Sequence, residues 1–313
     1  MVDIIIVNWN SGRYLLKCVQ SILQNSNEQV VKSIWIIDNH SSDNSISVLP
    51  SHPKIVIVEN KVNLGFSKAC NQGFKLCTSP YVLLLNPDVE LFSSTLSECI
   101  SYMDDHYEID IMGCQLHNDD GSVAHSCARF PTPLRYIYDT IGLSKMAPKI
   151  FTPALLMSDW DHKTSRFVDQ VMGAFMFMRF SVFEKLGYFD ERFFVYCEEL
   201  DFSKRLAGQG GKSYFNANIS AIHSGGGTTN SVKAYRLFLN LWSRLQYSKK
   251  HFSFFGYVVV SSCTYFVEPF TRILYLSLKG EFNEIKEVAK GYKLLLSNGK
   301  RFLKKQMIDR KLF

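Results

Sequence analysis

The sequence lacks the features that mark secreted, zinc-stabilised or membrane-spanning proteins. Its eight cysteines form no C-x-x-C pair and show no zinc-binding spacing, and most lie in apolar or helical stretches. This pattern favours a reduced, cytoplasmic protein over a disulfide scaffold. The chain begins at once with a predicted strand, without a basic region or a cleavage site, so we expect no signal peptide. It contains no internal repeat and no low-complexity tract.

Positive charge is scarce in most of the chain and concentrated near its end. Residues 1–232 carry 19 Lys and Arg against 24 Asp and Glu, a net charge of −5. Residues 233–313 carry 16 against 5, a net charge of +11. A protein that binds nucleic acid through general positive charge would be basic throughout. We therefore expect no nucleic-acid partner and a more local target for the basic C-terminal region.

Apolar runs and amphipathic segments alternate in the first 90 residues. We predict strands and intervening helices in turn, the strands over 3–10, 33–43, 54–60 and 80–88, and the helices over 11–24 and 65–77. Strands as continuously apolar as these are typical of a parallel sheet covered by helices on both faces. In such α/β sheets, ligands bind at the carboxyl ends of the strands. Polar residues stand at or just after these ends: Asn8, Asn10, Asp38, Asn63 and Asp88.

Asp88 follows the run "YVLLL" in the sequence Asn86-Pro87-Asp88. Proline has no N–H to donate, so it ends strand pairing and leaves a carboxylate at the mouth of the strand. Asp88 is therefore either a turn residue or a ligand of a divalent cation, since Mg²⁺ prefers one or two carboxylates with phosphate oxygens and water. Asp38 likewise has two interpretations: it either caps a helix or accepts a hydrogen bond from a base or sugar.

A second acidic group lies in "CEELD" (197–201), directly after a cluster of aromatic residues. Acids in the first turn of a helix favour its dipole, which would be a purely structural role. Burial beside aromatic rings raises the pKa of a carboxyl group and would suit it to act as a general base. His223, in "AIHSGGG", is similarly either a surface or core histidine or a metal ligand beside a phosphate-binding loop.

The remaining segments carry weaker patterns. "HNDDGSVAHS" (117–126) predicts a turn-connected hairpin, and residues 130–168, with four prolines, predict a long irregular excursion. From about residue 233 the chain is predicted to be helical and rich in aromatic residues.

In this order, the motifs resemble the family-2 inverting glycosyltransferases. The resemblance is strongest to the bacterial rhamnosyltransferase-like branch, which builds O-antigen and other surface polysaccharides. The matching segments include "IIIVNWNSGRYLLKCVQSI", "IIDNHSSDNS", "NLGFSKACNQG", "YVLLLNPDV", "GAFMFMRFSVFEKLGYFDERFFVYCEELDFSKRL" and "AIHSGGG", and they span residues 3–226, about 70% of the chain. The resemblance implies the α/β GT-A fold, a nucleotide-diphosphosugar domain with a mostly parallel central sheet.

The resemblance also implies a role for each matching position. The nucleotide-sugar donor would be bound by Asn8, Asn10, Asp38, Asn63, Lys68, Asn71 and Asn86, with Asp38 bonding the pyrimidine base. Asp88 keeps one carboxylate of the family's D-x-D metal motif, in which Asn86 replaces the other acid. Together with His223 and the donor diphosphate, Asp88 would hold Mg²⁺ or Mn²⁺.

The family's usual Glu-Asp-x-Asp motif reads Glu198-Glu199-Leu200-Asp201 in this chain. Glu199 stands at the position of the usual base, and Glu198 is the alternative. We expect direct, inverting attack by an acceptor hydroxyl, without a covalent sugar–enzyme intermediate. Two other classes of function are open: a nucleotidyltransferase, although "VNWNSGRY" has only one glycine in the loop concerned, and a non-catalytic carbohydrate-binding protein.

The branch resembled favours dTDP-L-rhamnose as donor, with UDP-linked hexose, GlcNAc or galactofuranose as alternatives. It also indicates O-antigen or lipopolysaccharide synthesis and a polyprenyl-diphosphate-linked saccharide as acceptor. We expect a GT-A domain over 1–232 and a membrane-associating helical region over 233–313. A homo-oligomer is left open.

The C-terminal region has two apolar segments. The uncharged run 252–267 has 16 residues, fewer than the roughly 20 that span a bilayer. Residues 281–296 place an apolar stripe on one helix face, which fits an interfacial helix or one packed on a core or partner subunit. Its members are Phe282, Ile285, Val288, Ala289, Tyr292 and Leu295. With the net charge of +11, this pattern predicts peripheral attachment to the inner face of the cell membrane.

Overall fold

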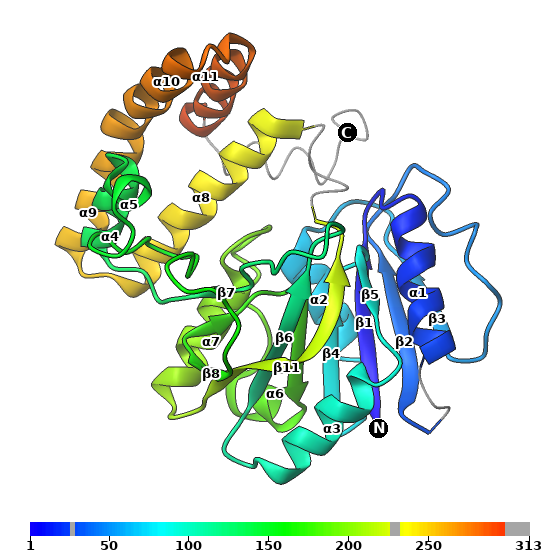
Figure 1. Ribbon diagram of the computed structural model, residues 1–313. Coiled ribbons are helices and arrows are strands. Elements are labelled where there is room, and N and C mark those ends of the chain that lie inside the picture. Colours follow the sequence, from blue (N-terminus) through cyan, green and yellow to red (C-terminus); the bar gives the residue numbers. More distant parts are fainter. Residues whose placement is uncertain (26–28, 226–231, 298–313) are drawn as a thin grey trace. The chain divides into compact units, whose positions relative to one another are not determined.

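The structure is a computed structural model that describes residues 1–25, 29–225 and 232–297. These residues form two compact units (Figure 1). Unit 1 contains the described residues of Met1–Arg129, Trp160–Glu191 and Glu198–Thr228, and unit 2 those of Phe130–Asp159, Arg192–Cys197 and Thr229–Phe313. The sequence-based division at residue 232 follows chain order, whereas unit 2 also takes in two internal segments. A single boundary in the sequence cannot describe a unit that is built from three separate segments.

Unit 1 is built on one large sheet. Within the described residues this sheet has nine strands in the order β3-β2-β1-β4-β10-β6-β11-β5, with β8 paired to β11. The strands are β1 (Val2–Asn8), β2 (Val31–Asp38), β3 (Ile55–Glu59), β4 (Tyr81–Leu85), β5 (Val89–Leu91), β6 (Ile111–His117), β8 (Arg166–Val168), β10 (Phe175–Arg179) and β11 (Ser213–His223). A separate two-stranded sheet pairs β7 (Cys127–Ala128) with β9 (Gln170–Val171).

The sheet is mostly parallel, as predicted. Strands β3, β2, β1 and β4 run parallel to one another, and β6 runs parallel to β11. Strand β10 lies between β4 and β6 and is antiparallel to both. This reversal places the start of β10 beside the carboxyl end of β4, with Phe175 opposite Leu85.

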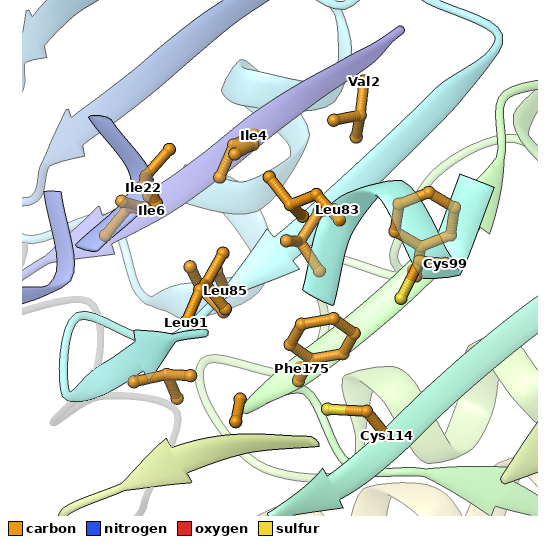
Figure 2. Close-up of a cluster of buried hydrophobic side chains, with 14 of the residues drawn as sticks. Val2, Ile4, Ile6, Ile22, Leu83, Leu85, Leu91, Cys99, Cys114 and Phe175 are labelled. Carbon is orange, nitrogen blue, oxygen red and sulfur yellow. The ribbon is translucent and has the colours of Figure 1, made fainter. Parts of the chain in front are cut away.

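Helices cover both faces of the sheet because the central strands present apolar side chains to both faces. Ile4 and Ile6 of β1 pack in a buried cluster that also contains residues of α1 and α3 (Figure 2). Ile5 points the other way, where a Cβ on Gly73 would lie 2.6 Å from its side chain, so α2 approaches closely only because residue 73 is glycine. The helices of unit 1 are α1 (Arg13–Asn25), α2 (Phe66–Phe74), α3 (Thr95–Asp105), α6 (Ser181–Leu186) and α7 (Glu198–Gly208). Each fully buried Ile or Leu contributes about 1.5–3 kcal/mol.

Two local predictions had different outcomes. In the segment 117–126, the Asn118 N–H donates to the Ser122 carbonyl at 2.8 Å and His117 bridges to Val123, so the predicted turn forms. The irregular excursion predicted for 130–168 was partly wrong. The segment contains α4 (Pro133–Thr140), α5 (Leu143–Met146) and strand β8, whereas residues 147–165 form no helix or strand, as predicted. Pro133 occupies the first turn of α4, where a helix needs no N–H donor, so this proline begins a helix.

Unit 2 is helical, which confirms the prediction for the described part of the C-terminal region. It contains α4, α5, α8 (Lys233–His251), α9 (Phe254–Ser262), a π-helical turn (Cys263–Val267), α10 (Glu268–Lys279) and α11 (Phe282–Leu296). Among the residues that the structure describes, no helix has both the length and the apolar character to cross a bilayer.

The apolar stripe of α11 packs inside unit 2. Val288, Tyr292 and Leu295 are buried in one cluster with Phe238 and Leu241 of α8. A Cβ on Gly291 would lie 3.0 Å from the Ala234 carbonyl, so the two helices are in close contact. Of the two readings of this stripe, packing on a core is therefore correct for its buried members, whereas Phe282 is 65% exposed.

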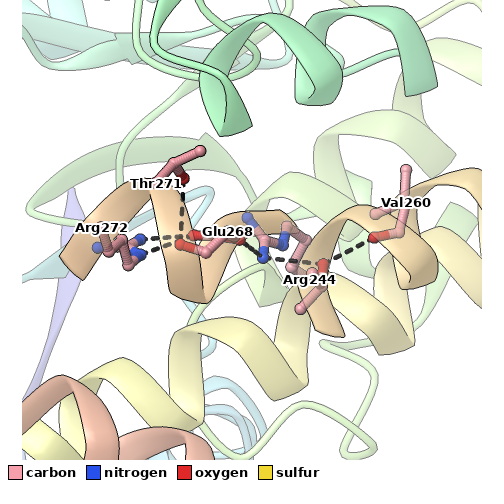
Figure 3. Close-up of polar contacts among 6 residues, drawn as sticks. Arg244, Val260, Glu268, Thr271 and Arg272 are labelled. Atoms are coloured by element: carbon pink, nitrogen blue, oxygen red, sulfur yellow. Dashed lines mark hydrogen bonds and ion pairs between the residues drawn. The ribbon is translucent and has the colours of Figure 1, made fainter. Parts of the chain in front are cut away.

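A buried ion cluster joins α8 to α10 (Figure 3). Glu268 accepts hydrogen bonds from Arg244 of α8 and, at 2.7 Å, from Arg272 of its own helix. Arg244 also donates to Thr264 Oγ1 at 2.9 Å, and this hydroxyl donates to the Val260 carbonyl. Burial raises the pKa of Glu268, but the charges and hydrogen bonds of the two arginines outweigh it, so the pKa is lowered. The carboxylate is thus kept ionised in the interior of unit 2.

Glu268→Gln should lower the free energy of unfolding by about 3 kcal/mol at neutral pH, because Arg244 would stay buried without its counter-charge. Since the pKa of Glu268 is lowered on folding, this stabilisation exists above the ordinary glutamate pKa and is lost as pH falls through the lowered value. Urea denaturation at a series of pH values measures both effects. Glu284→Gln, which removes the more exposed ion pair with Lys233, is the matched control and should cost below about 1 kcal/mol. Equal losses in the two variants would contradict the assignment.

Candidate active site

The carboxyl ends of β1 and β2 meet in a buried polar pair. Asn8 and Asp38 are register partners at the ends of these strands, and Asn8 Nδ2 donates to Asp38 Oδ1 at 2.8 Å and to Ser45 Oγ at 2.8 Å. Both residues are buried. Asn8 Oδ1 is buried with no hydrogen-bond partner among the described residues. This edge of the sheet therefore offers an unused acceptor where α/β proteins bind ligands.

Asp38 and Asn10 hold the loop that follows β2. The Ser41 N–H donates to Asp38 Oδ2 at 3.1 Å, and the Ser42 N–H donates to Asn10 Oδ1 at 2.7 Å. Asn10 adopts a left-handed backbone conformation (φ 51°), which asparagine tolerates better than most residues. Both residues therefore hold a turn. The helix-cap alternative for Asp38 was wrong, because the described residues 39–54 contain no helix. The contact of Asp38 and Asn10 with a nucleotide stays a prediction.

The predicted pocket residues of the next motif differ in exposure. Lys68 is exposed in the first turn of α2, whereas Asn71 is buried in the same helix. Asn71 donates to the Phe189 carbonyl at 2.9 Å and accepts the Phe189 N–H at 3.0 Å, so its side chain ties α2 to the loop before α7. Asn63 Oδ1 accepts a hydrogen bond at 2.9 Å from Asn39.

Asn39 was missed by the sequence analysis. It is buried directly after β2, and its Oδ1 accepts the Leu64 N–H at 2.9 Å. The available signal was the position of an amide side chain next to Asp38, at the end of an apolar strand. Asn39 and Asn63 together connect the loops after β2 and β3.

Asp88 and His223 come together although 134 positions separate them in the chain. Pro87 ends β4, and β5 then pairs with β11 so that Val89 lies opposite His223. As a result Asp88 Oδ1 lies 3.3 Å from His223 Nε2, and the Ser224 N–H donates to the Asp88 carbonyl at 3.0 Å. The two residues predicted to bind a metal are therefore neighbours.

This pair fits a divalent cation that takes further ligands from its substrate. A carboxylate suits Mg²⁺ and Mn²⁺, and a neutral imidazole is a common metal ligand. Neighbouring ligands of an octahedral ion at about 2.1 Å lie about 3 Å apart, close to the observed 3.3 Å. Among the described residues no group of three or more acidic, His or Cys side chains is arranged for metal binding. A bound ion would therefore depend on diphosphate oxygens and water.

The acid pair begins α7 directly after two strained residues. Tyr196 and Cys197 both have left-handed backbone conformations, with φ values of 69° and 67°. Two consecutive non-glycine residues in this region are costly, and such strain collects at functional sites. The sharp change of direction sets the orientation of Glu198 and Glu199 in the first turn of the helix.

The Glu199 carboxylate is held against the start of β10. It accepts the N–H of Gly173, and a Cβ on this glycine would lie 3.4 Å from Glu199 Oε1. Its second oxygen, Oε2, is buried without a hydrogen-bond partner among the described residues. Burial raises the pKa of Glu199, although hydrogen bonds from the backbone and from Glu198 oppose the shift. A carboxylate with a raised pKa and an unused oxygen is suited to accept a proton.

Asp201, the last acid of the motif, has a structural role. It is fully buried, and its Oδ2 lies 2.9 Å from Arg205 Nε. Arg205 in turn donates to the carbonyls of Leu186 and Tyr188, both at 2.8 Å. The ion pair therefore fastens α7 to the loop after α6.

The Asp88–His223 pair and the acid pair, Glu198 and Glu199, lie at the same end of β4. The Asn86 N–H donates to the Ala174 carbonyl at 3.0 Å, and the neighbouring Gly173 contacts Glu199. Asn86 is two residues from Asp88. All of these residues belong to unit 1, so one short hydrogen-bonded path connects the two halves of the candidate site.

Comparison with known proteins assigns the chain to a family. The family described as "Glycosyl transferase family 2" matches residues 3–187, more than half of the chain. The chain belongs to glycosyl transferase family 2. This membership makes it a glycosyltransferase and sets aside the nucleotidyltransferase alternative.

Several relatives within the family are similar at low identity. The "Low-salt glycan biosynthesis hexosyltransferase Agl10" of Haloferax volcanii is 28% identical over 257 residues, which cover 80% of this chain and 76% of the relative. "Rhamnosyltransferase WbbL" of Escherichia coli K12 is 26% identical, over 71% of this chain and 83% of its own. The "N-acetylglucosaminyl-diphospho-decaprenol L-rhamnosyltransferase" of Mycobacterium tuberculosis is 22% identical, over 71% and 76%. The predicted resemblance to rhamnosyltransferases is thereby confirmed.

Solved structures confirm the GT-A fold. A mannosyltransferase from Pyrobaculum calidifontis, in complex with GDP-Man and Mn²⁺, aligns with a TM-score of 0.54 and 13% identity over 96% of this chain and 79% of that chain. GalNAc-T7 with UDP, GalNAc and Mn²⁺ aligns with a TM-score of 0.52 and 12% identity, over 80% and 51%.

Asp201→Asn should destabilise unit 1 by about 2–4 kcal/mol, because it removes the charge partner of Arg205 in a buried pair. The measurement is the shift in the thermal and urea unfolding midpoints of the full chain. Glu199→Gln, two residues earlier in the same helix, is the matched control and should not lower them. An Asp201→Asn variant as stable as the wild type would contradict the structural role.

Proposed function

We propose that this glycosyltransferase moves a sugar from a nucleotide-diphosphosugar to a hydroxyl of a lipid-linked saccharide, with inversion at the anomeric carbon. The observation that carries the proposal is the meeting of two pairs at the end of β4. Asp88 and His223 form a metal-type pair at 3.3 Å, and the Glu199 carboxylate is held at Gly173 beside the same loop. In this proposal Asp88 and His223 help to stabilise the leaving group, and Glu199 removes the proton.

Glu199 is proposed as the general base. Its carboxylate takes the proton from the acceptor hydroxyl as that oxygen attacks the anomeric carbon from the face opposite the diphosphate. The bond from the anomeric carbon to the diphosphate oxygen breaks in the same step, and its electron pair leaves with the nucleotide diphosphate. Such positioned proton transfer is usually worth about 10²–10⁴ in rate. Glu198 is the second candidate for this role.

Asp88 and His223 are proposed to hold Mg²⁺ or Mn²⁺. When bound, the ion supplies positive charge that neutralises the developing charge of the diphosphate. The presence of Mn²⁺ in two structures of the same fold supports this part of the proposal. Asn8, Asn10, Asp38, Asn63, Lys68, Asn71 and Asn86 are proposed to bind the donor or to support the loops that do.

The donor is proposed to be dTDP-L-rhamnose. Support comes from the two relatives whose names specify rhamnosyl transfer, while the hexosyltransferase relative leaves UDP-linked sugars as the alternative. The decaprenol in the name of one relative supports a polyprenyl-diphosphate-linked acceptor. We further propose that the enzyme contributes to bacterial surface polysaccharide, such as O-antigen, and works at the inner face of the cell membrane.

Glu199→Gln should lower kcat by about 100-fold or more and leave the KM for donor nearly unchanged, because only proton transfer is lost. Since burial raises the pKa of Glu199, wild-type transfer should increase with pH through that raised value. The ionised carboxylate costs stability above the same pKa, so the variant should unfold at or above the wild-type temperature at pH 8. Rate–pH profiles and thermal unfolding measure these effects. An active Glu199→Gln with an inactive Glu198→Gln would assign the base to Glu198.

Asp88→Asn should remove the Mn²⁺-dependent part of donor binding. A donor at 100 times its Kd stabilises the folded wild type by about 2.7 kcal/mol, which thermal unfolding detects without any catalysis. A panel of nucleotide sugars with and without Mn²⁺ should give the largest shift for dTDP-L-rhamnose. Glu90→Gln, two residues away in an exposed pair with Lys17, is the control and should keep the shift. A larger shift with a UDP-sugar would replace the proposed donor.

A further inference from the structure

Helix α9, the π turn and α10 form one helical rod from Phe254 to Lys279 with a narrow buried stripe. The buried positions recur at every fourth residue: Gly256, Val260, Thr264 and Glu268. In a regular α-helix of 3.6 residues per turn, such a spacing would drift around the helix axis. The π turn at Cys263–Val267 takes more residues per turn, which counteracts the drift and keeps the stripe on one side.

Contacts within unit 2 fix this stripe in place. A Cβ on Gly256 would lie 2.9 Å from Pro133 at the start of α4, and Val260 packs in a buried cluster with Tyr136. Further along the rod, Arg244 of α8 holds both Thr264 and Glu268 (Figure 3). These contacts fix which side of the rod faces the rest of unit 2. They therefore also fix which residues lie on the opposite side.

The opposite face is strongly apolar and exposed. Single exposed apolar residues are normal, but a continuous row of large ones marks an interaction surface. The row, called here the exposed stripe, consists of Phe254 (74% exposed), Phe255 (79%), Phe266 (71%), Phe270 (72%), Leu274 (61%) and Leu278 (81%).

Positive charge accompanies the exposed stripe. The described residues of unit 2 carry 14 Lys and Arg against 6 Asp and Glu, a net charge of +8. At one end of the rod, Lys145 of α5 and Lys279 lie 4.6 and 4.8 Å from the ring centre of Tyr275. An apolar row flanked by lysines is complementary to a bilayer whose surface carries anionic headgroups.

We propose that the exposed stripe is a docking face for an anionic lipid bilayer, on which the rod lies parallel to the membrane plane. Glu268 and Arg272, in the middle of the rod, are incompatible with a spanning arrangement. Glu268 belongs to the buried stripe, and Arg272 pairs with it on that side of the rod. Helix α11 is a weaker docking element because the centre of its apolar stripe, Val288, Tyr292 and Leu295, packs against α8 and leaves large apolar side chains exposed only at the two helix ends, at Phe282 and Leu296. The inference rests on the proposed function, which requires access to a lipid-linked acceptor, and it names the surface that provides that access.

Flotation of the full chain with vesicles of phosphatidylcholine, with and without phosphatidylglycerol, tests the proposal. The wild type should float with the anionic vesicles. The triple variant Phe266→Ser, Phe270→Ser, Leu274→Ser should lose partitioning by about ten-fold or more, because three exposed apolar side chains no longer enter the interface. Phe92→Ser with Phe167→Ser, which removes exposed aromatic residues of unit 1, is the matched control and should float like the wild type.

Unchanged flotation of the triple variant, with thermal unfolding showing that it is folded, would overturn the proposal. A wild type that dimerises without lipid, and whose dimer but not vesicle binding is lost in the triple variant, would assign the stripe to a second copy instead. Transfer to a soluble acceptor analogue should be unaffected in the triple variant. Failure of the docking face therefore appears in flotation alone, and failure of the proposed chemistry appears in transfer alone.

Discussion

The antiparallel placement of β10 against β4 is the constraint on which the candidate active site depends. Pro87 ends the pairing of β4, so Asn86 is the last residue there whose N–H joins the sheet, and it donates to the Ala174 carbonyl. Because β10 begins at this point, Gly173 lies where its N–H can hold Glu199. A parallel β10 would bring its other end, Arg179, beside Asn86 and would leave Glu199 without this contact. One reversed strand thus connects the Asp88–His223 pair and Glu199, the two halves of the candidate site.

Glu268 and Glu199 both have buried carboxylate oxygens, but their neighbours shift the pKa in opposite directions. At Glu268 the charges of Arg244 and Arg272 outweigh burial, and the pKa is lowered. At Glu199 no arginine or lysine is among the groups that shift its pKa, and burial raises it. The first arrangement keeps a permanent negative charge that joins helices, and the second leaves a carboxylate that takes up a proton more readily than an ordinary glutamate. The same residue type is therefore kept charged in unit 2 and has its charged form disfavoured in unit 1.

The sequence was informative where a local pattern has one physical meaning. Continuous apolar runs ending in Asn8, Asp38 and Asn86 predicted the parallel strands and the edge at which the candidate site lies. The family motifs predicted that Asp88 and His223 act together, and the structure places them side by side. Direction was not predictable for β10, since apolar alternation is the same in parallel and antiparallel strands. Pro133 was one of the four prolines that predicted an irregular segment, because its place in the first turn of a helix depends on where that helix begins.

The apolar stripe of α11 shows a second limit of prediction from the sequence. Amphipathic periodicity shows that a helix has an apolar face, but it does not show what covers that face. Val288 and Tyr292 are covered by α8, and the close approach at Gly291 depends on contacts far apart in sequence. The left-handed conformations of Tyr196 and Cys197 were equally invisible, because nothing in these residue types requires them.

The distribution of cysteines has a practical consequence for spectroscopy. Six thiols are buried, and burial raises the pKa of each, so little thiolate forms at those positions: Cys18, Cys70, Cys77, Cys99, Cys114 and Cys127. Since thiolate is the reactive form, alkylating reagents should pass these six by in the folded chain. The two half-buried thiols are Cys197, next to Glu198, and Cys263, in the π turn. Burial also raises the pKa of Cys263, so a fluorescent or spin label should attach first at Cys197, beside the acid pair, without an engineered anchor point.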